Sequence, residues 1–161
     1  MPASMVLPGD VEQTLLATLG VNLPQINVGA ISEKDINDAD QLVLQMPCAR
    51  QRYVGSSYQD SADNQWLTYN VTHTFEIWCA AEDLTSKEAQ RTATLAVLTQ
   101  VIPLLAGARL SLPDGSLTDP IMLKQVGKLQ DDIVGTLFIL TIEIAGVAQF
   151  PGTLASGSED N

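Results

Sequence analysis

Hydrophobic and polar residues alternate with a period of two between residues 68 and 79, which predicts a β-strand with one buried and one solvated face. The apolar set consists of Tyr69, Val71, His73, Phe75, Ile77 and Cys79. The polar set consists of Thr68, Asn70, Thr72, Thr74 and Glu76. Trp78 falls among the polar positions. It is either an exposed aromatic that serves as a contact surface or a residue covered by a second layer of the same chain.

A helical pattern follows this strand. Thr85 stands three residues before Glu88, the spacing of a capping box, and predicts a helix from about residue 86 to residue 105. Its apolar positions recur every three or four residues, at Leu95, Leu98, Ile102 and Leu105. Gly107 supplies the stop. The sequence therefore predicts a sheet with a helix laid across its apolar face.

The segments before this unit predict one more helix and two more strands. Asp10 and Gln13 resemble a second capping box, followed by an apolar stripe that ends at Gly20. Strands are expected over residues 21–28 and 42–54, separated by an acidic segment, 32–41. The acidic segment lacks the glycine and the closing glutamate of a calcium loop, so a solvated loop is favoured. Residues 55–65 are small and polar and predict a surface loop.

The segments after the long helix predict a hairpin and a final strand. Pro113, Asp114, Gly115 and Ser116 form a turn signal between two apolar runs. A strongly apolar strand is expected over residues 133–147. Runs of strands with helices set apart predict an α+β fold, a mainly antiparallel sheet with two helices packed on one face. The expected divisions are a flexible N-terminal arm (1–9), a single α+β domain (10–150) and a disordered acidic C-terminal tail (151–161).

Composition narrows the function classes. The chain has 161 residues, with 19 acidic and 8 basic side chains and a net charge of -11. Specific binding of nucleic acid through phosphate neutralisation is not expected, because that mode needs clustered Lys and Arg. Residues 133–150 are apolar, but Glu143 and the alternation around it favour a central strand over a membrane span.

Candidate chemistry is sparse. Cys48 and Cys79 read as small buried hydrophobes in a reducing compartment, with a disulfide between neighbouring strands as the alternative. The single histidine, His73, reads as a satisfied core residue, so neither a metal nor another cofactor is expected. The sequence contains no G-x-S-x-G and no glycine-rich phosphate loop after a strand, and the neighbouring Asp131 and Asp132 fit a solvated turn. We therefore expect a protein that is not an enzyme.

The succession of elements resembles a known family. The segment with Pro47, Cys48 and Ala49, then Tyr53 to Gly55, precedes a polar loop, the strand over 66–80, the long helix, a hairpin and a closing apolar strand. This order, over residues 11–150, resembles the tail terminator (tail completion) proteins of Mu-like and related tailed bacteriophages. The resemblance implies a structural virion protein whose subunits form a ring, usually six-fold, that caps the tail tube, stops its polymerisation and joins the tail to the head.

The resemblance also implies partners and a location. The partners are other copies of the chain, the tail tube protein, the sheath protein if the tail is contractile, and head–tail connector proteins. DNA passes through such a ring without specific binding, which suits an acidic wall. The location is the virion tail, assembled in the cytoplasm of the host bacterium, without a membrane. Alternatives are a head–tail connector, a baseplate component, or a small α+β ligand-binding domain or enzyme. The candidate interface residues are Tyr58, Trp78, Asp114, Gly115 and Ser116.

Overall fold

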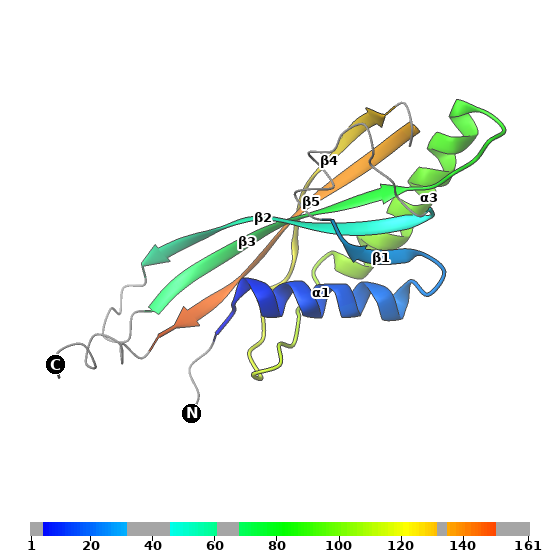
Figure 1. The fold of residues 1–161 in the computed structure, drawn as a ribbon. Coiled ribbons are helices and arrows are strands. Elements are labelled where there is room, and N and C mark those ends of the chain that lie inside the picture. The colour runs from blue at the N-terminus through cyan, green and yellow to red at the C-terminus, as the bar shows by residue number, and fades with distance from the viewer. Residues whose placement is uncertain (1–4, 32–45, 61–67, 132–134, 151–161) are drawn as a thin grey trace, which may run out of the picture.

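The computed structural model describes residues 5–31, 46–60, 68–131 and 135–150, without the side chains of residues 130, 131 and 135. Two helices, α1 (Pro8–Asn22) and α3 (Lys87–Leu105), accompany five strands (Figure 1). The strands are β1 (Asn27–Ala30), β2 (Cys48–Asp60), β3 (Thr68–Ala80), β4 (Met122–Asp131) and β5 (Gly135–Gln149). The predicted acidic segment 32–41 and the tail 151–161 lie outside the described residues.

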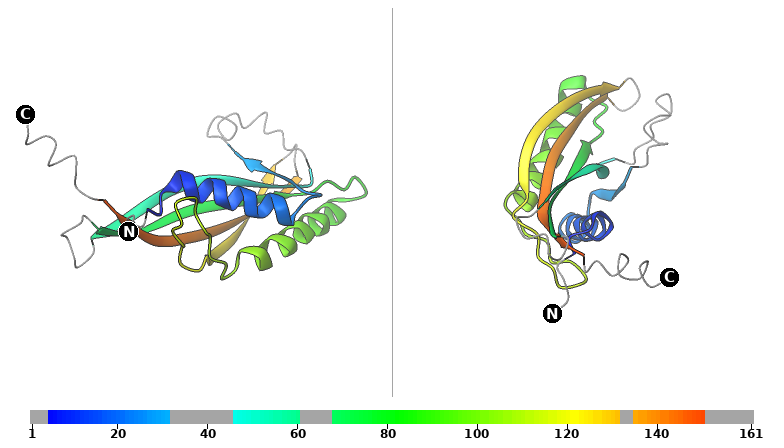
Figure 2. Two further views of the ribbon diagram at one scale, coloured as in Figure 1. Left: turned by 90° about the horizontal axis from the view of Figure 1, so that it is seen from below. Right: turned by 90° about the vertical axis from the view of Figure 1, so that its left-hand side faces the viewer.

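The strands form one sheet in the order β1-β2-β3-β5-β4. β1 runs parallel to β2, and every other neighbouring pair is antiparallel. Seen from below, both helices lie on the same side of the strands (Figure 2). The predicted α+β fold, with a mainly antiparallel sheet and two helices on one face, is therefore confirmed.

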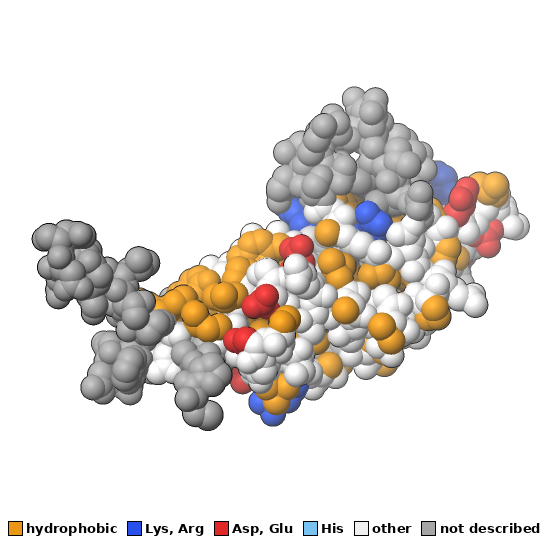
Figure 3. Space-filling model, turned by 60° about the horizontal axis from the view of Figure 1, so that its bottom comes forward, with side chains coloured by type: hydrophobic (Ala, Val, Ile, Leu, Met, Phe, Trp, Pro, Cys, Tyr) orange, Lys and Arg blue, Asp and Glu red, His pale blue; other side chains and the backbone are white. Residues whose placement is uncertain are grey.

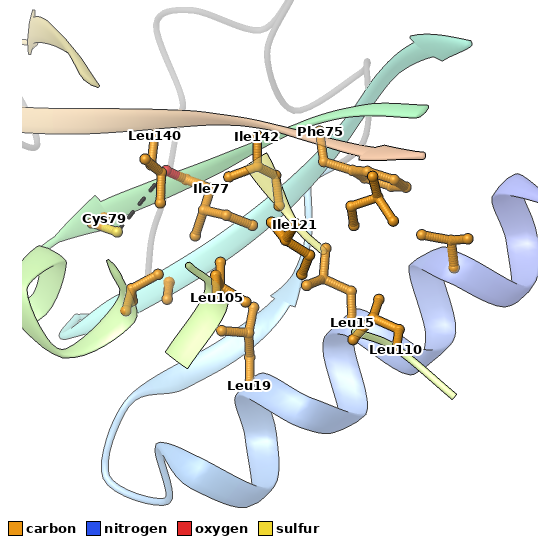
Figure 4. Close-up of a cluster of buried hydrophobic side chains, with 14 of the residues drawn as sticks. Leu15, Leu19, Phe75, Ile77, Cys79, Leu105, Leu110, Ile121, Leu140 and Ile142 are labelled. Carbon is orange, nitrogen blue, oxygen red and sulfur yellow. Dashed lines mark hydrogen bonds between the residues drawn. The ribbon is translucent and has the colours of Figure 1, made fainter. Parts of the chain in front are cut away.

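The core lies between the helices and the predicted apolar face of β3. Leu15 and Leu19 of α1 and Leu105 of α3 point towards Phe75 and Ile77 (Figure 4). The connection between α3 and β4 adds Leu110 and Ile121 to the same cluster. Antiparallel register aligns the apolar sets of neighbouring strands on one face, with Phe75 opposite Ile142 and Ile77 opposite Leu140. The period-two pattern thus generates the buried face directly.

The boundaries of α1 and β1 and the cap of α3 differ from the sequence prediction. Pro8 stands in the first turn of α1, where its fixed φ suits a helix, and the helix continues through Gly20 to Asn22. β1 is consequently displaced from 21–28 to Asn27–Ala30. The N-cap of α3 is Ser86, whose hydroxyl accepts from the Ala89 amide at 2.9 Å, and not Thr85. Gly107 does adopt a positive φ of 73° just after the helix, as its predicted stop role requires.

β2 extends beyond the expected loop boundary. Residues 55–60 were expected to begin a surface loop, but β2 continues through them to Asp60 after a bulge between Tyr53 and Gly55. Most side chains in this part of the strand are exposed. Its sequence therefore shows no alternation of apolar and polar residues from which a strand could be predicted. The remaining residues of the predicted loop, 61–65, lie outside the described residues.

One end of the sheet is closed by a buried polar network between α3 and the strands. The Gln90 amide nitrogen donates to the Ala81 carbonyl at 2.8 Å and to the Thr136 carbonyl at 3.1 Å. The Gln90 carbonyl oxygen accepts from the Thr136 amide at 3.0 Å. Thr94 accepts from the Ala81 amide at 3.1 Å. The side chains of α3 thus satisfy backbone groups at the end of β3 and the start of β5, where burial would otherwise make them costly.

Candidate interaction surfaces

The opposite end of the sheet projects beyond both helices. The far ends of β2, β3 and β5 extend past the start of α1 (Figures 1 and 2). Hydrophobic side chains gather on this narrow end in the space-filling view (Figure 3). Four aromatic rings stand on the helix-side face here, and we call them the aromatic cluster: Tyr53, Tyr58, Tyr69 and Phe150.

The aromatic cluster combines internal packing with exposure. The Tyr58 and Tyr69 ring centroids lie 6.1 Å apart, edge to face, and Tyr69 and Phe150 are also 6.1 Å apart. Such contacts fix the ring orientations. Even so, 47% of Tyr58 and 36% of Tyr53 are accessible to solvent. Tyr58, a predicted interface residue, thus packs against a neighbouring ring and is still nearly half exposed, and its role in an interface stays a prediction.

A hydrogen-bonded relay lies beneath the aromatic cluster. His73 is fully buried, and its Nε2 lies 2.8 Å from the Val6 carbonyl oxygen. A carbonyl only accepts, so Nε2 carries the proton and Nδ1 accepts from the Ser56 hydroxyl at 2.6 Å. The Ser56 hydroxyl also contacts the Tyr53 hydroxyl. Burial lowers the pKa of His73, with the Val6 hydrogen bond acting in the opposite direction. The sequence-based interpretation of His73 as a satisfied core residue is confirmed.

The relay was missed at the sequence level because the pairing of Ser56 with His73 depends on the bulge in β2. Without the register shift between Tyr53 and Gly55, Ser56 would point to the other face of the sheet. A serine donating to an imidazole is also the first requirement of nucleophilic catalysis. Here Ser56 lies within an extended strand, and the histidine is engaged with the backbone of Val6. The geometry accounts for the group as a structural tether.

The tether holds the segment before α1 against the sheet. Met5 forms a bridge with Ala148, and the Val6 amide donates to the Val147 carbonyl at 3.2 Å. The Val6 side chain is fully buried over Gly146, where an added Cβ would lie only 2.6 Å from Val6 Cγ2. Residues 5–9 of the arm expected over 1–9 thus comprise an anchored segment and the start of α1.

The predicted turn at residues 114–116 is present. The Asp114 carboxylate accepts from the backbone amide and the hydroxyl of Ser116, both at 2.9 Å, and these bonds lower the pKa of Asp114. Gly115 adopts a positive φ of 88°, and Ser111 bridges to Leu117 across the turn. Ser116 Oγ accepts from the Met5 amide at 3.1 Å. The turn therefore supports the N-terminal segment, and its role in an interface between proteins stays a prediction.

Trp78 is not the exposed aromatic that the alternation suggested. Only 5% of it is accessible, and it packs with Ile31, Cys48, Ala80 and Leu137 on the sheet face opposite the helices. Its indole nitrogen donates to Glu76 Oε1 at 3.0 Å. The alternative reading, in which the chain itself covers Trp78, is the correct one. A period-two pattern places a residue on a face but does not reveal a second small cluster on that face.

Strand β4 is an exposed edge of the sheet. Among the described strands it pairs only with β5, and the side chains of residues 122–126, 128 and 129 are exposed. Large apolar residues stand on both of its faces: Met122 (58% accessible), Leu123 (36%), Val126 (46%) and Leu129 (41%). Lys124 forms an ion pair with Glu143 at 3.6 Å. An edge of this length with apolar side chains on both faces is a template for pairing with another chain.

The two cysteines and the space between the helices complete the description of the possible sites. Cys48 and Cys79 are both buried and unbridged, and burial raises their pKa values to about 11 and about 12. A shallow groove between the end of α1 and α3 is lined by small and apolar residues, including Leu23, Pro24, Ala93 and Ala96. Within the described ranges, no cluster of His, Cys, Asp and Glu suits a metal ion. No helix in the same ranges is long and apolar enough to cross a membrane.

The sequence matches no family model and no curated protein. Among solved structures, it is similar to a chain from the "Virion of native gene transfer agent (GTA) particle", with a TM-score of 0.46 and 12% sequence identity. That match covers 89% of this chain and 98% of the other. A likeness of this degree carries no function from one protein to the other.

Proposed function

We propose that this chain is a structural virion protein and, more specifically, a tail terminator whose subunits form a ring on the tail tube. One observation carries the proposal: the exposed large apolar side chains lie mainly on an open edge strand, β4, and on the projecting end of the sheet. Exposed apolar groups in such clusters mark surfaces that bind other proteins. The resemblance in element order to tail terminator proteins supplies the specific role.

The charge of the chain supports this role. A net charge of -11 gives the ring an acidic character that repels DNA phosphates, so DNA can pass without adhering. The partners under this proposal are further copies of the chain, the tube protein and the proteins that connect the head. The proposal includes the absence of catalysis, because the Ser56–His73 contact serves to anchor Val6.

The mass of the assembled protein and the length of the tails of a phage that lacks its gene test the proposal. Sedimentation velocity of the full chain over a hundredfold concentration range should show a discrete species of several subunits, visible as a ring in electron micrographs. Deleting the gene from the phage that carries it should yield overlong tails without heads. A strictly monomeric chain would refute the ring. Tails of normal length that fail to join heads would instead identify the connector role named among the alternatives.

A further inference from the structure

In the described part of the chain, the sheet has two open edges on opposite sides. β4 forms one outer edge along its whole length. On the other side, β1 pairs with only the first four residues of β2, from Cys48 to Gln51. Among the described residues, positions 53–60 of β2 therefore have a neighbouring strand, β3, on one side only. One sheet thus offers two unpaired strand segments of similar length, facing in opposite directions.

We propose that β4 of one copy pairs with residues 53–60 of β2 in the next copy, so that the sheet continues from subunit to subunit. The inference rests on the proposed ring and names the surface that closes it. Such pairing is heterologous, since one surface meets a different surface, and heterologous contacts close into rings when the rotation permits. The backbone hydrogen bonds of strand addition supply the affinity, and the side chains on each face supply the register.

The topology fixes the direction of this pairing. Within one copy, β2 is antiparallel to β3, β3 to β5, and β5 to β4, so β4 runs opposite to β2. A rotation about an axis roughly along the strands preserves strand direction. β4 therefore meets β2 of the next copy in antiparallel orientation, the more stable arrangement per residue.

Antiparallel pairing also brings complementary residues together. The beginning of β4 lies beside the far end of β2, where Asp60 is exposed. Val126 lies on the helix-side face, the same face as the exposed Tyr58. A β-branched residue beside an aromatic ring is a favourable cross-strand pair. Lys124 and Lys128 are two of the eight basic residues in a chain with a net charge of -11, so an acidic neighbour attracts β4.

The alternative of a two-fold contact is disfavoured by the same lysines. If β4 paired with β4 of a second copy in antiparallel orientation about Val126, near the middle of its exposed run, Lys124 and Lys128 of one strand would stand beside Lys128 and Lys124 of the other. Like charges at adjacent cross-strand positions are destabilising. Burying β4 against itself would also leave residues 53–60 of β2 open. The head-to-tail pairing uses both edges.

Cross-linking of engineered cysteines tests the pairing. Ser57 and Gln125 are exposed and lie on the same sheet face, opposite the helices. In adjacent strands about 4.8 Å apart, a flexible bismaleimide spanning about 12 Å tolerates a register offset of about three residues. The double variant Ser57→Cys/Gln125→Cys should give a ladder of covalent oligomers that ends at the ring size. Cys48 and Cys79 are buried, so the unmodified chain should not react.

Matched controls separate this pairing from ring formation itself. Gln100 is exposed on α3, so Ser57→Cys/Gln100→Cys should give no ladder although its ring is intact. A wild-type ring without a ladder above this control would overturn the strand pairing and leave the ring. Covalent dimers from Gln125→Cys alone would show β4–β4 pairing instead. A wild-type chain that sediments only as a monomer would overturn both the pairing and the ring.

Discussion

The two ends of the sheet are built in opposite ways. At the end covered by α3, Gln90 and Thr94 satisfy buried backbone groups of both long strands, and Trp78 fills a small cluster on the other face. At the projecting end, aromatic rings pack on one another but stay open to solvent, with Tyr58 47% accessible. The side chains at the covered end stabilise the subunit itself. At the projecting end, packed aromatic side chains stay accessible to solvent, as an external contact under the proposed function would require.

This difference indicates why the fold needs the relay at His73. Strands that extend past their helices have less core to hold them, and the described helices contact the strands mainly over the covered part. Where no helix covers the end of β5, the anchored segment at Met5 and Val6 lies along the strand and hydrogen-bonds to it. Gly146 leaves room for the Val6 side chain, and His73 binds the Val6 carbonyl group. The projecting end is thus stabilised locally without being covered.

The largest expected effect is a difference in unfolding free energy between alanine variants of Trp78 and Tyr58, the two aromatic residues at the opposite ends of the sheet. Trp78→Ala should lower the free energy of unfolding by about 3 kcal/mol, because it removes a buried ring and leaves a cavity. Tyr58→Ala should lower it by about 1 kcal/mol or less, since nearly half of that side chain is already solvated. Urea denaturation followed by fluorescence and circular dichroism measures both. Equal losses in the two variants would mean that the ends do not differ as described.

Assembly should respond in the opposite order. Under the proposed ring, Tyr58→Ala weakens oligomer formation at concentrations where its subunit is fully folded. Trp78→Ala affects the ring only in proportion to the unfolded fraction. Sedimentation velocity beside the urea curves separates the two effects. If Trp78→Ala dissolved the ring while its subunits stayed folded, its surroundings would have to include an intersubunit contact.

A smaller effect is expected where the anchored segment crosses β5. Gly146→Ala introduces a methyl group 2.6 Å from Val6 Cγ2, so the segment has to shift, at a cost of about 1 to 2 kcal/mol. Gly127→Ala in β4 is the matched control, because the nearest atom to its added methyl group would be the Ile139 carbonyl oxygen at 4.0 Å. Its stability should change by about 0.5 kcal/mol at most.

A second substitution should relieve the clash between the new methyl group and Val6. Val6→Ala in the Gly146→Ala background removes the two contacting methyl groups, so the two changes should cost less together than their sum. Unfolding free energies of the single and double variants give this coupling directly. Additive losses would show that Gly146 is required for a reason other than the Val6 side chain.

The sequence predicted the covered part of the molecule better than the projecting part. The alternation in β3 and the spacing of Leu98 and Leu105 in α3 report burial against a core, which is what periodicity measures. Residues 55–60 of β2 carry no such signal, because both of their faces are largely solvated. The contact of Ser56 with His73 depends on a bulge that no residue pattern announces. The pattern placed Trp78 on the correct face but left its burial open, because its covering cluster comes from segments distant in sequence, including Ile31.

The smallest expected effect is a pH dependence confined to the projecting end. Burial lowers the folded-state pKa of His73 below its ordinary value of 6.5, so the unfolded chain takes up a proton first as the pH falls. The stability contributed by neutral His73 is therefore complete above pH 6.5 and is lost as the pH falls from there through the folded pKa. Asp83 and Asp114 have pKa values lowered below 3.8, so their contribution is lost only in stronger acid. The unfolding midpoint in urea should thus fall between about pH 7 and pH 5 in the wild type, and fall less in His73→Gln, where nothing titrates at this position. An identical fall of the unfolding midpoint in both chains would assign the pH dependence to groups outside the relay.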